Sequence, residues 1–489
     1  MSQTLQEARS FEKRHGSAIP DRDRPLFHLT PWIGWMNDPN GFSWYRGQYH
    51  LFYQYHPFRT RWAAMHWGHA VSDDLVSWRY LPAAMAPDQP YDAMGCFSGT
   101  AATLPDGRQL LLYTGVHLDG EHKERQGQCV AIGDGLNYEK IPQNPVLSED
   151  GLPEELSPYD FRDPRIWRTE RGFRCVVGAC TRQGRMGVIL QYESDDGIHW
   201  RFLGELARND GSHGRMWECP DFFPLDGRWV LSVSPQDMLA VPYRYASGNG
   251  TVCMIGDLNE DGTRFIPDTD QPVDYGMDFY APQTLVTPDG RTVMIAWMQN
   301  WDTVNHDDEP HIPWHNQMTV AREIRVRDGR LIQRPVRELE RLRADPLERR
   351  DLRVRGDLSL PGLRGRVADL TVRVRAAEED KPCPGFALKV AESADFFTEI
   401  RYQDGVLTLD RAYSGTRRNF SHQRSCRVRE VDGAIQLRVL IDRFSVEAFV
   451  NDGEQALTAV VRTDPAADGI ALWTAGDALV DIQKYALTR

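Results

Sequence analysis

Three acidic residues lie in sequence surroundings that are unusual for surface carboxylates. Asp38 lies in WMNDPNG, Asp163 in YDFRDPRIW and Glu218 in RMWECPDFF, so proline and aromatic residues flank each of them. Arg162 next to Asp163 would keep that carboxylate ionised by Coulombic attraction, whereas the apolar neighbours of Glu218 would favour its protonated form. Cleavage of a glycosidic bond needs this combination: an ionised carboxylate attacks the anomeric carbon, and a protonated one releases the leaving group.

Each acid also has a structural interpretation. The residues around Asp38 favour tight turns, so its side chain could cap its own backbone in a loop between strands. Asp163 could serve only as the ion partner of Arg162, and Glu218 could be the acidic end of a surface hairpin. Three separate structural roles would have to coincide with three proline-aromatic surroundings. The sequence therefore favours one shared chemical site.

A regular repeat of strands could position these acids. Short apolar runs such as YHLFYQY and WVLSVSP alternate with turn-forming residues, and helical periodicity is rare, which predicts an all-β protein. A pattern of strand, acidic turn and aromatic residue recurs about every 61 residues, at Ser72, Gly133, Ser194 and Gly256. Chance recurrence of acidic hairpins is the alternative, but the even spacing predicts a propeller with blades of about four strands. Counting one more blade, shared between the start of the chain and residues 279–335, gives five blades.

The composition changes after the propeller region. The stretch RPVRELERLRADP predicts a short amphipathic helix that closes the ring. From about residue 350, polar and apolar residues alternate with period two, which predicts a C-terminal antiparallel β-sandwich. The predicted domains are a catalytic propeller over 1–340, a linker over 341–352 and a sandwich over 353–489. In the propeller, the innermost strands would bring acids that are distant in sequence to one central cavity.

Six motifs in order resemble glycoside hydrolase family 32, the invertases and fructan hydrolases. They are WMNDPNG at 35–41, YQ at 53–54, WGH at 67–69, FSGT at 97–100, RDP at 162–164 and ECP at 218–220. The resemblance covers the first 340 residues, and the remainder matches only as a generic sandwich. It implies a five-bladed propeller with an appended β-sandwich. It also implies retaining hydrolysis of terminal non-reducing β-D-fructofuranosyl units in sucrose and short fructooligosaccharides.

The resemblance also assigns roles to residues. It implies that Asp38 is the nucleophile, Glu218 the acid/base, and Asp163 the stabiliser that binds fructose hydroxyls beside Arg162. The residues matching positions that line the fructose pocket or its rim are Asn37, Gln54, Trp62, Phe97, Ser98, Tyr280, Trp297 and Trp301. Three residues at the expected pocket edge depart from the family pattern, His56, Ala63 and Thr100, and they put the preferred leaving group in question.

Composition restricts the partners. With 57 Lys and Arg against 70 Asp and Glu, the formal charge is −13, which argues against nucleic-acid or anionic-membrane partners and suits a small neutral saccharide. The N-terminal stretch has no apolar core of a secretory signal, no run of about 18 apolar residues follows, and the eight cysteines form no Cys-x-x-Cys pair. We therefore expect reduced thiols, a cytoplasmic location and a monomer or homodimer.

We expect no cofactor and no metal. The two histidine pairs that could suggest a metal site, His66 with His69 and His311 with His315, each lack a clustered third ligand.

Three other functions stay open. The ring could bind a saccharide without cleaving it, although the presence of all three acids favours an enzyme. Five-bladed arabinofuranosidases and xylosidases also use three acids, but they lack the NDPNG and ECP pairing. Finally, Arg59 and Arg61 beside Trp62 could meet a phosphate, which would make sucrose 6-phosphate the substrate.

Overall fold

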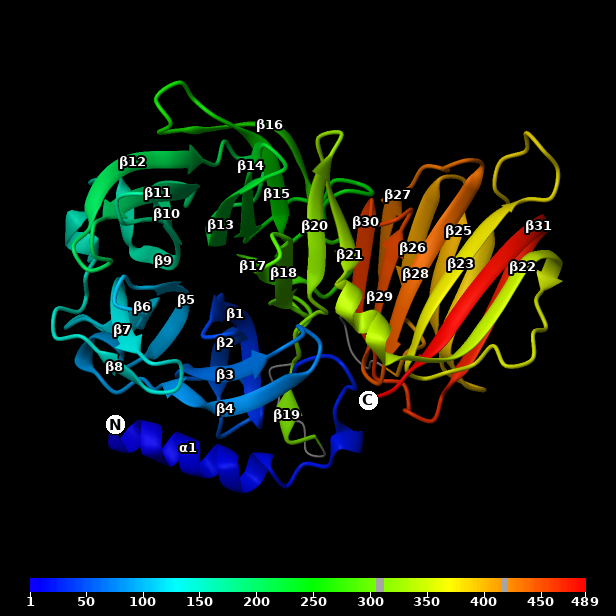
Figure 1. The fold of residues 1–489 in the computed structure, drawn as a ribbon. Coiled ribbons are helices and arrows are strands. Elements are labelled where there is room, and N and C mark those ends of the chain that lie inside the picture. Colours follow the sequence, from blue (N-terminus) through cyan, green and yellow to red (C-terminus); the bar gives the residue numbers. More distant parts are fainter. Residues whose placement is uncertain (305–311, 416–420) are drawn as a thin grey trace.

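The computed structural model describes residues 1–304, 312–415 and 421–489, and these form two all-β units side by side (Figure 1). The N-terminal unit, blue to green in the figure, is a propeller of five blades in the described chain, and the C-terminal unit, yellow to red, is a β-sandwich. The predicted fold class is therefore confirmed.

Each blade is an antiparallel sheet whose first strand lies nearest the centre of the ring. The first strands of neighbouring blades contact one another, so their side chains can converge on the axis. The strands of the blades, in order, are β1 (Gly34–Tyr45), β2 (Gln48–His56), β3 (His66–Ser72) and β4 (Trp78–Met85); β5 (Gly95–Thr103), β6 (Gln109–Leu118), β7 (Glu124–Gly133) and β8 (Tyr138–Lys140); β9 (Leu156–Arg168), β10 (Phe173–Thr181), β11 (Gly187–Ser194) and β12 (Arg201–Arg208); β13 (Trp217–Leu225), β14 (Arg228–Pro235), β15 (Val252–Leu258) and β16 (Phe265–Pro272); β17 (Tyr280–Val286), β18 (Thr292–Trp297), β20 (Arg322–Arg327) and β21 (Arg330–Pro335).

The sequence repeat corresponds to the third strands of the first four blades. Ser72, Gly133 and Ser194 end β3, β7 and β11, and Gly256 lies in β15. The expected sharing of the fifth blade is wrong, because that blade comes from 280–335 alone. The ring closes instead through β19 (Trp314–His315), which pairs in parallel with β1 of the first blade. A strand of two residues carries too little pattern to be seen in the sequence.

An N-terminal helix escaped the sequence analysis. Helix α1 (Gln3–Gly16) runs along blade one beneath β4 (Figure 1). The Ser2 hydroxyl caps it by accepting from the Leu5 amide at 3.3 Å. Its buried face includes Glu12, whose carboxylate accepts from the Ala83 amide at 2.8 Å. Burial raises the pKa of Glu12 to about 7.

Short 3₁₀ helices lie in the segments that precede or connect the strands. The predicted ring-closing helix is one of them, and it buries Leu339. They are η1 (Asp21–Asp23), η2 (Pro90–Asp92), η3 (Glu149–Gly151) and η4 (Arg337–Leu342).

The sandwich is held together by its last strand. The N-terminal part of β31 (Gly469–Leu487) pairs with β24 and its C-terminal part with β23, so one strand joins both layers. The other strands are β22 (Arg343–Asp357), β23 (Ala368–Ala376), β24 (Phe386–Glu392), β25 (Thr398–Gln403), β26 (Val406–Asp410), β27 (Gln423–Arg427), β28 (Ala434–Asp442), β29 (Ser445–Val450) and β30 (Gln455–Val460).

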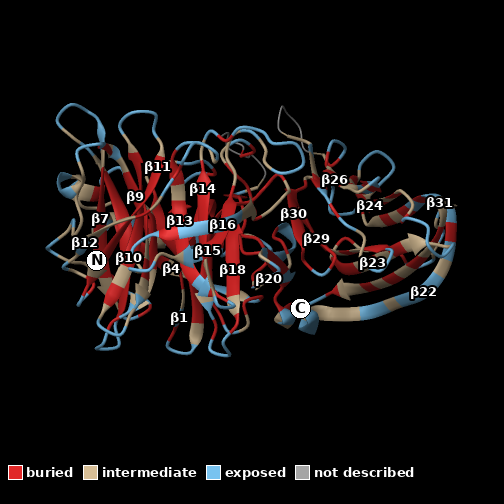
Figure 2. Ribbon diagram, turned by 90° about the horizontal axis from the view of Figure 1, so that it is seen from above, coloured by how far each residue is buried: buried red, intermediate tan, exposed pale blue. Residues whose placement is uncertain are grey.

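The predicted linker over 341–352 is not a linker. Most of it belongs to β22, which pairs with β31 from Arg343 opposite Leu487 to Asp357 opposite Trp473. Its charged, largely exposed residues are typical of an edge strand, and this polarity made the segment resemble a linker (Figure 2).

Buried charges join the two units. The His28 ring, in the segment before β1, lies 2.9 Å from both Asp442 and Glu447 of the sandwich. Arg322 of β20 contacts Glu447 at 2.6 Å and Asp274 at 2.9 Å, and its side chain is fully buried. The junction is therefore a packed interface rather than a flexible connection.

The eight cysteines all lie within the described residues, and they are free and buried. Across the described ranges, no helix is both long and apolar enough to span a membrane.

Candidate active site

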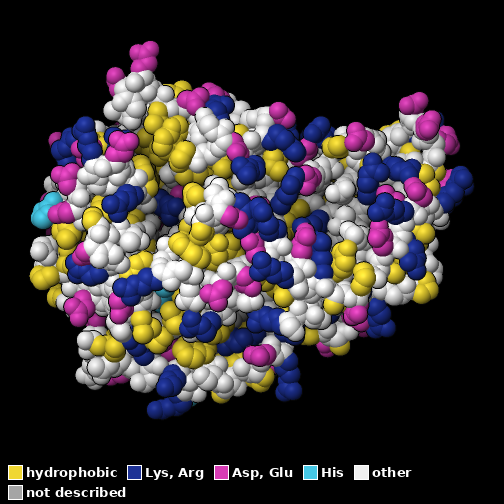
Figure 3. Space-filling model, in the orientation of Figure 1, with side chains coloured by type: hydrophobic (Ala, Val, Ile, Leu, Met, Phe, Trp, Pro, Cys, Tyr) yellow, Lys and Arg dark blue, Asp and Glu magenta, His cyan; other side chains and the backbone are white. Residues whose placement is uncertain are grey.

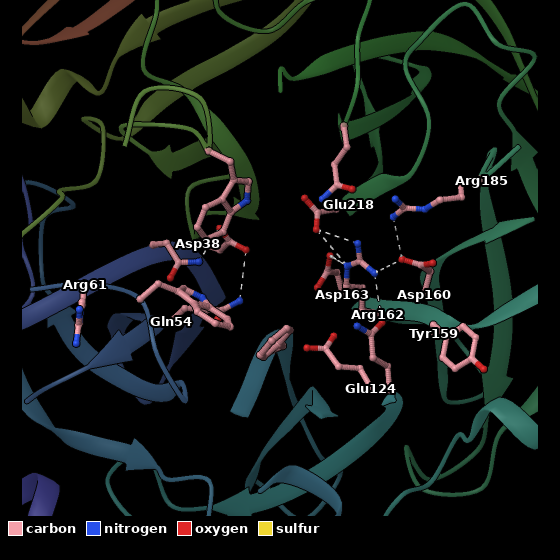
Figure 4. A pocket seen from close by; sticks show the side chains of 16 residues that line it. Asp38, Gln54, Arg61, Glu124, Tyr159, Asp160, Arg162, Asp163, Arg185 and Glu218 are labelled. Carbon is pink, nitrogen blue, oxygen red and sulfur yellow. Dashed lines mark hydrogen bonds and ion pairs between the residues drawn. The ribbon is translucent and has the colours of Figure 1, made fainter. Parts of the chain in front are cut away.

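The propeller face shown in Figure 3 is hollowed at its centre. A cavity of about 520 Å³ lies where the first strands meet, and it contains all three acids that the sequence analysis selected. It is lined by Asn37, Asp38, Gln54, Arg61, Trp62, Phe97, Glu124, Gln126, Tyr159, Asp160, Arg162, Asp163, Arg185, Glu218, Gln236 and Trp301. Figure 4 shows Asp38 on one side of the cavity, with Glu218 and Asp163 across from it.

Irregularities in the first strands aim these side chains inward. The pairing register shifts between Met36 and Pro39 in β1 and between Glu218 and Asp221 in β13. β9 has the corresponding shift beside Asp163, whose φ of 66° is left-handed, and Cys219 next to Glu218 has a φ of 47°. Bulges and left-handed residues are typical of functional sites, where they turn side chains out of the ladder.

Asp38 is fixed by donors on both of its oxygens. The Ser98 hydroxyl of β5 donates to Oδ2 at 2.6 Å, and the Asn37 amide donates to Oδ1 at 3.1 Å. Gln54 donates to the Ser98 hydroxyl at 2.6 Å, and Trp35 donates to the Asn37 oxygen at 2.8 Å. Burial raises the pKa of Asp38; the Ser98 hydrogen bond opposes this shift and the charge of Glu218 adds to it.

Arg162 binds Glu218 rather than its sequence neighbour. Its Nη2 and Nε atoms donate to Glu218 Oε1 at 3.0 and 3.1 Å, while Nε lies 3.9 Å from Asp163 Oδ2. The Tyr280 hydroxyl donates to Glu218 Oε2 at 2.7 Å. The expected apolar surroundings of Glu218 are therefore wrong, because flanking residues in a strand point away from the side chain they flank.

Asp163 is also in a different environment from the one expected. Its Oδ2 accepts from the Cys219 amide at 3.0 Å. Burial raises the pKa of Asp163; Arg162 opposes this, but Glu218 and Asp38 add to it. Arg162 thus lowers the pKa of Asp163 as expected, but burial, together with the carboxylates of Glu218 and Asp38, outweighs this effect, so the net shift of the Asp163 pKa is upward.

The remaining predicted residues divide into lining and supporting groups. Asn37, Gln54, Trp62, Phe97, Arg162 and Trp301 line the cavity. Ser98 lies behind Asp38, and Tyr280 is buried behind Glu218, so these two support the acids instead of forming the wall or rim. Trp297, expected at the rim, is fully buried and packs against Trp301.

The residues that depart from the family pattern also lie elsewhere than expected. Within the described residues, the cavity wall does not include His56, Ala63 or Thr100. His56 packs against Phe58 and His66, and Thr100 is buried.

Sequence reasoning missed one wall of the cavity. This wall consists of Glu124, Gln126, Tyr159, Asp160, Arg185 and Gln236. Three of its members carried a usable signal. Glu124 and Gln126 are two residues apart in β7, and Asp160 precedes Arg162 by two residues in β9, so each pair shares a face of its strand. Arg185 and Gln236 lie in connections between strands, where no periodicity marks them.

In the described chain, no group of three or more His, Cys, Asp or Glu residues could hold a metal ion. His69 lies 3.0 Å from the ring of His50. His311 lies outside the described residues.

Comparisons with known proteins agree along the whole chain. Residues 28–335 match the Glycosyl hydrolases family 32 N-terminal domain, and residues 338–486 match the Glycosyl hydrolases family 32 C terminal. A sucrose-6-phosphate hydrolase of Escherichia coli is 36% identical, over 92% of this chain and 91% of the relative. A raffinose invertase of Escherichia coli is 35% identical over 98% of both chains. The solved structure of a Bombyx mori GH32 beta-fructofuranosidase superposes with a TM-score of 0.85 at 30% identity, covering 99% of this chain and 98% of that one.

Proposed function

Because the chain belongs to glycosyl hydrolase family 32, we propose that it is a retaining β-fructofuranosidase that removes terminal non-reducing β-D-fructofuranosyl units from sucrose and short fructooligosaccharides. The observation that carries this proposal is the placement of Asp38 and Glu218 on opposite sides of one cavity. A cytoplasmic location and a monomeric or dimeric state stay predictions.

The first half of the reaction transfers the fructosyl unit to the protein. Asp38 attacks the anomeric carbon while Glu218 donates its proton to the glycosidic oxygen, so the old bond breaks as an ester to Asp38 forms. The hydrogen bonds from Ser98 and Asn37 restrict rotation of the Asp38 carboxylate, which keeps the attacking oxygen within reach of one carbon.

The second half returns both acids to their starting state. Glu218, now ionised, takes a proton from water as the water attacks the same carbon, and the Asp38 ester breaks. Asp163 and Arg162 line the cavity next to these groups, in place to bind the hydroxyls of the fructosyl ring. Hydrogen bonds to sugar hydroxyls that strengthen in the transition state lower the barrier further.

Two substitutions test these roles. We expect Asp38→Asn, which keeps the shape of the side chain, to lose several orders of magnitude in turnover with an unchanged circular dichroism spectrum. We expect Glu218→Ala to be impaired far less on an aryl β-D-fructofuranoside than on sucrose, because a good leaving group needs no protonation. Retention of more than about a tenth of the rate in the first variant, or equal impairment on both substrates in the second, would contradict the assignment.

A second candidate substrate is sucrose 6-phosphate. Arg61 and Arg185 both line the cavity, on opposite sides of it in Figure 4, and guanidinium groups bind phosphate well. Arg59 does not belong to the lining. Comparing kcat/KM for sucrose, sucrose 6-phosphate and long inulin decides: we expect sucrose to be preferred, and a tenfold preference for the phosphorylated sugar that Arg61→Gln abolishes would favour the second candidate.

A further inference from the structure

Asp160 bridges two arginines beside the catalytic acids. Its Oδ1 lies 3.0 Å from Nη1 of Arg162 and 3.4 Å from Nη2 of Arg185. Its Oδ2 accepts from the Ser157 hydroxyl and the Cys180 thiol, both at 3.2 Å. A carboxylate with partners on both oxygens is held in one orientation, and Figure 4 shows it on the side of Arg162 away from Asp38.

The Arg162 guanidinium joins Asp160 to Glu218. Its Nε and Nη2 atoms donate to Glu218, and its Nη1 atom donates to Asp160 and, at 3.3 Å, to Gln126. Although burial alone would lower the pKa of Arg162, the carboxylates of Glu218, Asp163 and Asp160 raise it, so the guanidinium stays charged. Its positive charge is therefore shared among these carboxylates, and its hydrogen bonds to carboxylates go to Glu218 and Asp160.

This sharing matters because Glu218 must both give and take a proton. The positive charge of Arg162 attracts the ionised carboxylate of Glu218. If Arg162 interacted with Glu218 alone and not also with Asp160, this attraction would be stronger. We infer that Asp160 is a positioning residue that draws part of the Arg162 charge away from Glu218 and thereby sets the pH above which the enzyme can no longer protonate its leaving group. This inference rests on the proposed acid/base role of Glu218.

The groups around Asp160 favour its ionised form, in which it can bridge Arg162 and Arg185. Burial by itself would raise the pKa of Asp160, but the charge and hydrogen bond of Arg162, the Cys180 thiol and Arg185 lower it. The other charged side chains of the cavity wall near Asp160 are Asp163 on the same strand, Glu124 on β7 and Glu218 on β13.

Asp160→Asn tests the inference because it keeps an oxygen for Arg162 and removes only the charge. In the pH profile of kcat/KM for sucrose, we expect the alkaline limb of this variant to lie about one pH unit below that of the wild type. On an aryl β-D-fructofuranoside the limb should stay in place, since that leaving group departs without a proton. Asp160→Glu, which restores the charge, should return the limb most of the way.

Asp195→Asn is the matched control. It makes the same change in net charge in the exposed turn between β11 and β12, which the antiparallel strand order places at the opposite end of the blade from Arg185. We expect its pH profile to match that of the wild type. An unmoved limb in Asp160→Asn, or an equal shift in Asp195→Asn, would overturn the inference.

A second variant, Arg185→Gln, should shift the alkaline limb of the pH profile in the opposite direction. Arg185→Gln removes the other cation on Asp160 Oδ1 and leaves that oxygen to Arg162, so the alkaline limb should move to higher pH. This keeps the inference testable if Asp160→Asn does not fold, and an unmoved or lowered limb would contradict it. Failure of the proposed function is distinguishable, because Glu218→Ala would then be equally slow on sucrose and on the aryl fructoside.

Discussion

His28 should make the stability of the whole chain depend on pH. Its Nδ1 and Nε2 atoms each lie 2.9 Å from a carboxylate, on Asp442 and Glu447, and all three side chains are buried. A neutral imidazole can donate from only one nitrogen, so the doubly protonated ring is the form that donates to two ionised carboxylates at once. Burial alone would lower the pKa of His28, but its hydrogen bonds to the two carboxylates outweigh burial and raise it to about 9.

The size of the effect follows from that shift. Between the ordinary value of 6.5 and about 9, the difference corresponds to about 3 kcal/mol of stability. Because the folded-state pKa is the higher one, this contribution is complete below pH 6.5 and disappears as the pH rises through about 9. Breaking a buried ion pair costs a similar amount, about 3 to 5 kcal/mol.

The assay compares the wild type with His28→Gln in urea unfolding at pH 6.5 and at pH 9.5. Titrating groups away from this cluster act equally in both proteins, so the difference between them reports on His28 together with its partners Asp442 and Glu447. We expect the variant to be less stable by about 3 kcal/mol at the lower pH, with the difference nearly gone at the higher pH. A difference that stays constant across this range would refute the account of a charged His28 at the junction.

Three other substitutions probe separate features. Gly276→Ala should lower the free energy of unfolding by about 2 kcal/mol or more in urea, because a β-carbon there would lie 2.1 Å from the Thr458 nitrogen across the domain junction; unchanged stability would contradict this close packing. Glu12→Gln should raise the free energy of unfolding by about 2 kcal/mol at pH 8 and hardly change it at pH 4. The folded-state pKa of Glu12 is raised, so the native carboxyl group is fully favourable only below its ordinary pKa of 4.5, and this contribution is lost as the pH rises through about 7. Thermal scans that show no gain for the variant at pH 8 would contradict this prediction. Ser98→Ala should lower kcat for sucrose about tenfold to a hundredfold with little change in KM, because Asp38 loses its 2.6 Å donor; steady-state kinetics that show only a raised KM would assign Ser98 to substrate binding instead.

The sequence indicates that the three acids belong together, and it shows the repeat, because both leave local marks. Asp38, Asp163 and Glu218 stand out by their flanking residues, and the third strands of the blades share a hairpin pattern that survives without any tertiary information. Neither mark depends on how the chain closes in space.

The details that escaped prediction are set by tertiary structure. Which carboxylate Arg162 binds depends on the bulges of β9 and β13, and neighbours in sequence point to different sides of a strand. The ring closes through β19, which has only two residues. The segment that forms β22 is so highly charged that it is recognised as a strand only from its pairing with β31. Glu12 is buried only because α1 packs on the first blade.

The most direct test of the central claim is the anomeric form of the fructose first released from sucrose. A double displacement through Asp38 and Glu218 retains configuration, so proton NMR within the first moments of hydrolysis should show β-fructofuranose accumulating before mutarotation. An initial accumulation of the α-anomer would mean that water, and not Asp38, attacks the anomeric carbon, and it would contradict the mechanism.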